Sequence, residues 1–273
     1  MHVSRYFCTM KLWIILLPFC IVFAACGGND DQAAKATSAQ LEVLELLQTR
    51  VAQHPDSASV RMQLVNALDS LQMYTEAIAQ TDSMILRDSL NNGLWFARGQ
   101  LLESNRDTAA AIASYEKALT IYPSVETQLN LANLYAEKKD TRSLALCQNV
   151  SRMGLGRETD AGCDFIAGVY HARTGNNEKA LAFFDRAINN NYTLMEAYME
   201  KGFVYYSTQK LPDALKTFET AITVSNTYAD AYYWKAKTQE AMGQKDQALL
   251  NYERALGLDI QLKEAREAIK RLD

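Results

Sequence analysis

Residues 178–188 read EKALAFFDRAI, residues 212–222 read PDALKTFETAI and residues 246–256 read DQALLNYERAL. The three stretches share two alanines, and each alanine recurs at the same constant interval. The first series is Ala180, Ala214 and Ala248, and the second is Ala187, Ala221 and Ala255. Further upstream, Ala77 and Ala111 are separated by this interval again. A fixed period of this kind indicates a chain built from repeated structural units.

The composition favours helices within these units. Of 273 residues only 12 are Gly and 4 are Pro, the two residue types with the largest helix penalties. The period and its pattern resemble the tetratricopeptide repeat, a helix–turn–helix unit of about 34 residues. The resemblance rests on a small residue at position 8 of a repeat, Ala at position 20 and an aromatic residue at position 24, as in Gly202, Ala214 and Phe218.

The resemblance implies an all-α fold, a right-handed superhelical solenoid of about six helical hairpins with a capping helix at each end. We expect it over residues 39–273, with repeats near 58–91, 92–125, 125–158, 161–194, 195–228 and 229–262 and a C-terminal cap at 263–273. Small residues let the two helices of a hairpin approach, and large residues at positions such as 24 fill the gaps between hairpins. No hairpin can bury its apolar face alone, so stacking supplies the core.

The third repeat departs from the pattern. Leu144, Gln148 and Ser151 stand where the other repeats carry Ala, an aromatic residue and Ala. The spacing from Leu144 to Ala180 is slightly longer than the period of the other repeats, and the stretch includes residues 154–156, Gly-Leu-Gly. We interpret this stretch as a loosened joint that divides repeats one to three from repeats four to six.

Residues 1–25 have the features of a secretory signal peptide. Lys11 precedes an uncharged run, 12–25, which is shorter than the ~20 residues that a membrane-spanning helix needs. An uncleaved anchor helix is the alternative. Residues 23–26, Phe-Ala-Ala-Cys, resemble the bacterial lipobox, which implies that Cys26 is lipidated; a chance cysteine near an ordinary cleavage site is the other interpretation. Residues 26–38 then form a lipidated flexible tether.

The destination of the anchored chain follows from the residues after Cys26. Gly27 stands where an Asp would resemble an inner-membrane retention signal, which favours the outer membrane. Asp30 and Asp31 weakly resemble the acidic export signal of surface lipoproteins. The expected location is therefore the outer membrane, lipid-anchored, on the periplasmic face or the cell surface.

Charge and cysteine content limit the partners. Removal of residues 1–25 takes Arg5 and Lys11 and changes the net charge from −4 to −6, which excludes the basic footprint of a nucleic-acid-binding protein. Cys147 and Cys163 then remain, and an oxidising compartment suggests a disulfide between them. The expected helix ends place them at heights that differ by roughly 9 Å, too far for a disulfide. We therefore predict two free, buried thiols.

No pattern of catalytic or metal-binding residues is found in the sequence. His171 takes a position that is normally a packed aromatic residue, and His54 precedes Pro55 in a turn. No His–Cys–carboxylate group has the spacing of a metal site, and no phosphate loop or nucleophile elbow occurs. We predict neither an enzyme nor a bound metal or cofactor.

In the family that the chain resembles, the first helix of each repeat lines a concave groove, mainly through positions 2, 5, 6, 9, 12 and 13. The predicted peptide-binding residues are Phe165, Val169, Met199, Phe203, Tyr206, Tyr233, Trp234, Glu200, Asn130 and Asn133. The alternative for each aromatic or apolar residue is that it packs beneath the next repeat. A basic clamp for a terminal carboxylate is not matched, because Met62 and Ala97 stand in its place. With Glu196, Glu200 and Asp230 nearby, we expect a peptide that mixes basic and apolar residues.

These features predict a non-enzymatic scaffold or adaptor of the cell envelope that binds a peptide or protein partner in the groove and reaches the membrane through its lipid. No nucleic-acid partner is expected. The alternative is a surface-exposed structural or binding lipoprotein for glycan or a host protein.

Overall fold

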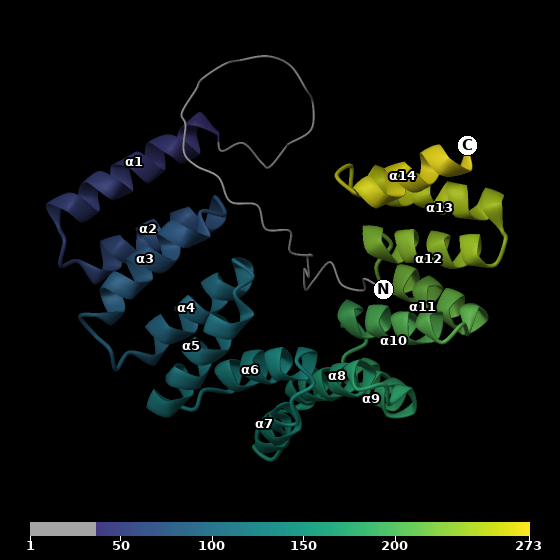
Figure 1. Ribbon diagram of the computed structural model, residues 1–273, viewed down its shortest axis with the longest axis horizontal. Coiled ribbons are helices and arrows are strands. Elements are labelled where there is room, and N and C mark those ends of the chain that lie inside the picture. The colour runs from purple at the N-terminus through teal and green to yellow at the C-terminus, as the bar shows by residue number, and fades with distance from the viewer. Residues whose placement is uncertain (1–36) are drawn as a thin grey trace, which may run out of the picture. The chain divides into compact units, whose positions relative to one another are not determined.

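The computed structural model describes residues 37–273, and all the regular structure in this range is helical (Figure 1). The predicted signal peptide 1–25, Cys26 and residues 26–36 of the tether lie outside the described residues. The chain divides into two compact units, with the boundary between Ile121 and Tyr122. The helices of the first unit are α1 (Ser38–Gln53), α2 (Ala58–Ser70), α3 (Tyr74–Ile85), α4 (Asn92–Ser104) and α5 (Thr108–Ile121).

The second unit contains the remaining nine helices of the described range. They are α6 (Val125–Glu137), α7 (Arg142–Ser151), α8 (Arg157–Arg173), α9 (Asn177–Asn190), α10 (Met195–Ser207), α11 (Leu211–Val224), α12 (Ala229–Ala241), α13 (Lys245–Leu258) and α14 (Lys263–Leu272). None of the helices in residues 37–273 combines the length and the apolar content needed to cross a membrane.

The helices confirm the expected all-helical fold of paired helices. The first helices of five repeats begin where the period places them, at Ala58, Asn92, Val125, Met195 and Ala229. The fourth repeat differs, because α8 begins at Arg157, four residues before the expected start at residue 161. The extra turn follows Gly154 and Gly156, whose φ angles of 64° and 105° lie in the region that favours glycine.

Each hairpin turns in the same way at position 15 of its repeat. The residue there has a positive φ angle in all six repeats: Gln72, Arg106, Lys139, Gly175, Gln209 and Gly243. The amide of the following residue donates to the carbonyl five residues earlier, as Met73 does to Leu68 and Lys210 to Tyr205. This is the Schellman arrangement that ends a helix and satisfies its last carbonyl groups.

The aromatic residues at position 24 pack against the small residues at position 8 of their own hairpins. A Cβ atom added at Gly168 would lie 2.5 Å from the Phe184 ring, and one added at Gly202 would lie as close to the Phe218 ring. Both rings are fully buried. The expectation that these rings fill gaps between hairpins is therefore incomplete, because each ring first closes the gap inside its own hairpin.

The predicted joint at residues 154–156 does not separate the units. Cys147 and Val150 of α7 share one core with Cys163 and Ile166 of α8, so the degenerate third repeat packs with the fourth. The boundary at Ile121 lies one repeat earlier and just before Pro123. The third repeat lacks the pattern residues, yet its second helix still packs against the first helix of the fourth repeat.

Both expected caps are helical. In α1, Leu44 and Leu47 are buried, whereas Leu41 is 51% exposed. Thr37 caps this helix by accepting a hydrogen bond from the amide of Gln40. At the other end, α14 packs Ala265 and Ala268 into a core that also contains Tyr252 of α13. Thus α14 contributes apolar packing as well as a charged outer face.

Candidate functional site

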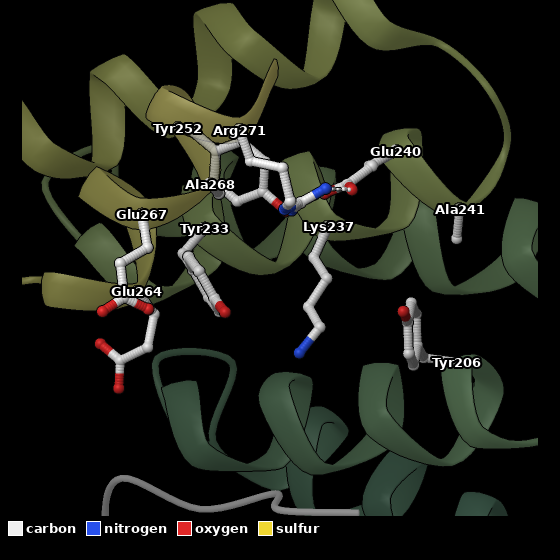
Figure 2. Close-up of a pocket in the computed structure, with 10 residues that line it drawn as sticks. All are labelled: Tyr206, Tyr233, Lys237, Glu240, Ala241, Tyr252, Glu264, Glu267, Ala268 and Arg271. Carbon is white, nitrogen blue, oxygen red and sulfur yellow. Dashed lines mark hydrogen bonds and ion pairs between the residues drawn. The ribbon is translucent and has the colours of Figure 1, made fainter. Parts of the chain in front are cut away.

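A pocket of about 430 Å³ opens among the C-terminal helices of the second unit (Figure 2). Helix α10 contributes Tyr206, and α12 contributes Tyr233, Lys237, Glu240 and Ala241. The other lining residues come from α13 and α14: Tyr252, Glu264, Glu267, Ala268 and Arg271. The pocket exists because α12 presents a residue every third or fourth position toward the same side.

Aromatic rings form the walls of this pocket. The rings of Tyr233 and Tyr252 are 5.6 Å apart, and Tyr206 meets the ring of Trp234 edge-on at 5.6 Å. Burial raises the pKa of Tyr206, so its hydroxyl stays protonated at neutral pH. Such rings offer a large apolar surface and few rotatable bonds to a ligand.

Lys237 places a positive charge inside the aromatic walls. Figure 2 shows its side chain reaching from α12 into the space between Tyr206 and Tyr233. Its ammonium nitrogen lies 4.4 Å from the ring centroid of Trp234 and 5.7 Å from that of Tyr233. Within residues 37–273 no ion pair joins this nitrogen to a carboxylate. Burial lowers the pKa of Lys237, and the more distant carboxylates of Glu240 and Glu264 oppose that shift. A partly desolvated ammonium that makes no close ion pair favours an anionic group of a ligand.

The Glu240 carboxylate already has partners within the protein. Arg271 of α14 forms an ion pair with it, and the Tyr252 hydroxyl donates a hydrogen bond to its Oε2 atom at 2.8 Å. The bonds from Arg271 lower the pKa of Glu240, so this carboxylate stays ionised and holds α14 against α12 and α13. Glu264 and Glu267 lie at the exposed rim, on the far side of Tyr233 from Lys237 (Figure 2). The pocket therefore offers a cation within and acids at the rim.

The structure brings two of the predicted peptide-binding residues, Tyr206 and Tyr233, into this pocket. Trp234 lies beneath Lys237, and Phe203 packs against Trp234 with ring centroids 4.6 Å apart. Both of these rings are half-buried and support the wall. The predicted set thus includes two side chains that line the pocket and two that lie behind them.

Other predicted residues belong to the core. Val169 and Met199 are only 1% and 3% exposed, so for them the alternative interpretation, packing beneath a neighbouring helix, is correct. Phe165 is half-buried against Phe184, with ring centroids 6.1 Å apart. These three side chains stabilise the stack and leave little surface for a ligand.

Glu200 is not an accessible peptide-binding residue as predicted. It is buried and forms an ion pair with Arg173 of α8, which also binds Glu137 of α6. Burial raises the pKa of Glu200, and the Arg173 guanidinium opposes that shift. The carboxylate therefore links helices and is not available to a basic ligand group.

The asparagines of α6 lie away from the pocket. Asn130 and Asn133 are half-buried, and the Oδ1 atom of Asn133 is buried without a hydrogen-bond partner in the described range. Nothing in the structure joins them to the residues around Lys237, so their place in the peptide-binding set stays a prediction. No group of three or more His, Cys, Asp or Glu side chains within residues 37–273 could hold a metal ion.

Sequence reasoning missed Lys237, Glu240, Tyr252 and the α14 residues. The signal for the first two was present, because they occupy positions 9 and 12 of the last repeat, which belong to the groove-lining set. From α12 the predicted peptide-binding set named only Tyr233 and Trp234, so Lys237 and Glu240 were left out. The α14 residues gave no such signal, because a charged terminal helix is also what solubility requires.

Comparison with known proteins identifies the repeat. A tetratricopeptide-repeat family model matches residues 62–126, another matches residues 229–259, and a model described as a TPR repeat matches residues 202–243. Among curated proteins, the Hsp70-Hsp90 organizing protein 2 of Arabidopsis thaliana is 26% identical over 176 residues, which cover 64% of this chain and 29% of that protein. The human DnaJ homolog subfamily C member 7 is 23% identical over 207 residues, or 74% of this chain and 37% of that protein. The chain thus matches about a third of each relative.

Solved structures share the fold. A tetratricopeptide repeat protein from Parabacteroides merdae superposes with a TM-score of 0.71 at 17% identity, over 85% of this chain and 92% of that one. PilW, described as a widely conserved type IV pilus biogenesis factor, gives a TM-score of 0.63 at 19% identity, over 77% of this chain and 97% of its own. At these identities the likeness is one of fold.

Proposed function

We propose that this chain, which carries tetratricopeptide repeats, is a non-enzymatic scaffold that binds a peptide segment of a partner protein in the pocket around Lys237. Proteins of this fold are generally adaptors, and none of the matched families is catalytic. We further propose that the scaffold is anchored by a lipid on Cys26 to the bacterial outer membrane and serves the cell envelope.

The ammonium of Lys237 is the observation that carries this proposal. It lies among three tyrosines and makes no close ion pair in the described residues, while Glu240 and Glu264 act on it only from a longer distance. A peptide carboxylate, from Asp, Glu or a chain terminus, would supply the missing partner, and apolar side chains beside it would pack on Tyr206 and Tyr233. A basic residue further along would reach Glu267 at the rim. The proposed ligand thus combines an acidic and an apolar group, with basic residues secondary.

Selection from a library of displayed random peptides tests this ligand chemistry. Bound peptides should carry a carboxylate next to an aliphatic or aromatic residue. Lys237→Met keeps the length of the side chain and removes its charge, so we expect the affinity to fall at least tenfold, about 1.4 kcal/mol. Lys235→Met is the matched control, because Lys235 lies on the same helix and forms an ion pair with Glu219 instead.

The Lys235 variant should bind within about twofold of the parent, which is under about 0.5 kcal/mol. Thermal melts of both variants separate lost binding from lost folding. Selected peptides that bind the folded Lys237→Met protein as tightly as the parent would show that the pocket is not the site.

The anchor is tested separately. Each buried methylene of an acyl chain contributes about 0.8 kcal/mol to membrane binding. A lipid anchor with three acyl chains therefore binds the membrane far more tightly than a single chain, which binds only weakly. We expect the parent to incorporate labelled palmitate and to fractionate with outer membranes, and Cys26→Ser to do neither. A processed Cys26→Ser protein that still fractionates with membranes would contradict lipidation at this residue and leave the peptide pocket unaffected.

A further inference from the structure

Two cysteines lie side by side in the core of the second unit. Cys147 of α7 and Cys163 of α8 are 5% and 3% exposed and belong to one apolar cluster with Val150 and Ile166. Both are free thiols, as the sequence predicts. Their side chains are hydrogen-bonded to each other, however, with the Cys147 thiol donating to the Cys163 sulfur. The expected separation is therefore wrong.

The helix ends explain the difference. Helix α7 stops at Ser151, four residues after Cys147, and α8 begins at Arg157, six residues before Cys163. At about 1.5 Å per residue, the heights of the two cysteines along antiparallel helices then differ by only about 3 Å. The sequence-based estimate used a later end for α7 and a later start for α8, which together produced the larger offset.

The surroundings of the two sulfur atoms differ. Cys163 accepts hydrogen bonds from Cys147 and from Ser151, and these lower the pKa of Cys163 to about 7, although burial and the charges of Asp160 and Asp164 oppose the shift. The same contact with Cys163, together with burial, raises the pKa of Cys147. The thiolate therefore forms on Cys163, and Cys147 retains its proton.

We propose that Cys147 and Cys163 are an oxidative modification site, where a disulfide-bearing oxidant converts the two thiols into a reversible disulfide that ties α7 to α8. The chemical class of the reagent is a small-molecule or protein disulfide, written RSSR. This site is independent of the proposed peptide pocket, which lies on other helices.

The reaction proceeds by two exchanges. The Cys163 thiolate attacks one sulfur of RSSR, the S–S bond breaks, and one RS⁻ leaves with a proton from solvent as RSH. Cys147 then loses its proton and attacks the Cys163 sulfur of the mixed disulfide, which releases the second RS⁻. In sum, two cysteine thiols and RSSR give one cystine and two RSH, and two electrons pass from the chain to the oxidant.

Access to the buried pair requires a local opening, and α7 is suited to one. It has only 10 residues, and its N-cap residue Thr141 makes no side-chain hydrogen bond to the helix, although Asp140 accepts one from the Arg142 amide. Gly154 and Gly156 follow it with positive φ angles. Once formed, the disulfide closes the connection between the two helices and restricts this opening.

Oxidation of the full chain with excess oxidised glutathione tests the site. The protein is unfolded and alkylated without reductant, then digested with trypsin, which yields residues 143–152 and 158–173 as separate peptides. We expect these peptides to be recovered joined, to separate on reduction, and to show at least tenfold slower amide exchange in α7 of the oxidised protein.

Two variants test the order of events. Cys147→Ser should stop at a glutathione adduct on Cys163, and Cys163→Ser should form an adduct on Cys147 at least tenfold more slowly. Recovery of both peptides alkylated and separate after oxidation would overturn the proposal. Joining of either peptide to Cys8, Cys20 or Cys26 instead would overturn it equally.

Discussion

At the scale of single residues, the glycines at position 8 set the distance between the helices of a hairpin. Gly168 of α8 lies under the Phe184 ring, which is fully buried. Gly162 lies on the same helix, and a Cβ atom added there would meet nothing within 4 Å. The two glycines therefore share a helix and differ in packing.

This pair separates packing from helix propensity. Alanine at either position gains about 0.5–1 kcal/mol in helix propensity. Gly162→Ala should therefore raise the free energy of unfolding by that amount. Gly168→Ala should lower it by about 1–3 kcal/mol relative to Gly162→Ala, because the methyl group must displace the ring. Urea unfolding of both variants measures the difference, and equal midpoints would show that Phe184 moves without cost.

The residue scale is also where prediction of the site was weakest. Tyr206 and Tyr233 were found because a repeat position fixes a face of the helix. Val169, Met199 and Glu200 were misplaced because a turn of about 100° per residue moves a side chain from groove to core, and the sequence does not show how neighbouring repeats cover that face. How far the next hairpin buries a side chain depends on tertiary packing, which the repeat pattern does not specify.

At the scale of helices, one arginine connects three of them. Arg173 of α8 donates from Nε to Glu137 of α6 at 2.8 Å and from Nη1 to Glu200 of α10 at 2.9 Å. The three side chains are 21%, 21% and 11% exposed, in that order. The arginine therefore joins the first helices of three successive repeats.

Removal of this arginine should be costly. Arg173→Met leaves two carboxylates, one of them buried, facing each other without a cation, and we expect a loss of about 2–4 kcal/mol in the free energy of unfolding. Adding Glu200→Met should recover part of the loss, because it removes the buried unpaired charge. Lys201→Met is the control, since its partner Asp185 is 52% exposed and the pair should contribute less than about 1 kcal/mol. Chemical denaturation of the four proteins gives the comparison; an Arg173→Met protein as stable as the control contradicts it.

The helices themselves were the most predictable part of the chain. The constant period predicted the first residue of the first helix in most repeats, because each unit repeats the same turn. The first helix of the fourth repeat begins a turn earlier than predicted, because Gly154 and Gly156 allow α8 to start at Arg157. The spacing of alanine and aromatic residues contains no signal for this early start. The same displacement brought Cys163 to Cys147.

At the scale of the whole molecule, each unit has cores of its own. All residues of the cluster around Phe184, the cluster around Phe218 and the cluster around Tyr252 lie in the second unit. The first unit has a separate cluster around Leu64 and Leu68. Repeat proteins derive their stability from single repeats and their nearest neighbours, so a block of repeats with a complete core can fold by itself.

We expect residues 122–273 to fold when expressed alone. Circular dichroism should show a helix content per residue like that of the whole chain, with a cooperative melt. Amide exchange should be slow in the same helices, α8 to α13, as in the intact protein. A fragment that binds hydrophobic dyes and lacks protected amides would mean that the second unit depends on the first.

The recurring turn at position 15 has a consequence for how the sequence can change over evolutionary time. Four of its six residues, Gln72, Arg106, Lys139 and Gln209, hold φ angles near 60° that side chains other than glycine tolerate at a cost of about 1–2 kcal/mol. Gly175 and Gly243 at the same position show that the turn accepts glycine, which adopts this φ angle without that cost. We therefore expect an exchange to glycine at any of these four positions to add stability without touching the pocket. Such a reserve lets a lineage accumulate destabilising exchanges on its binding surface, and hence new partners, while the scaffold stays folded.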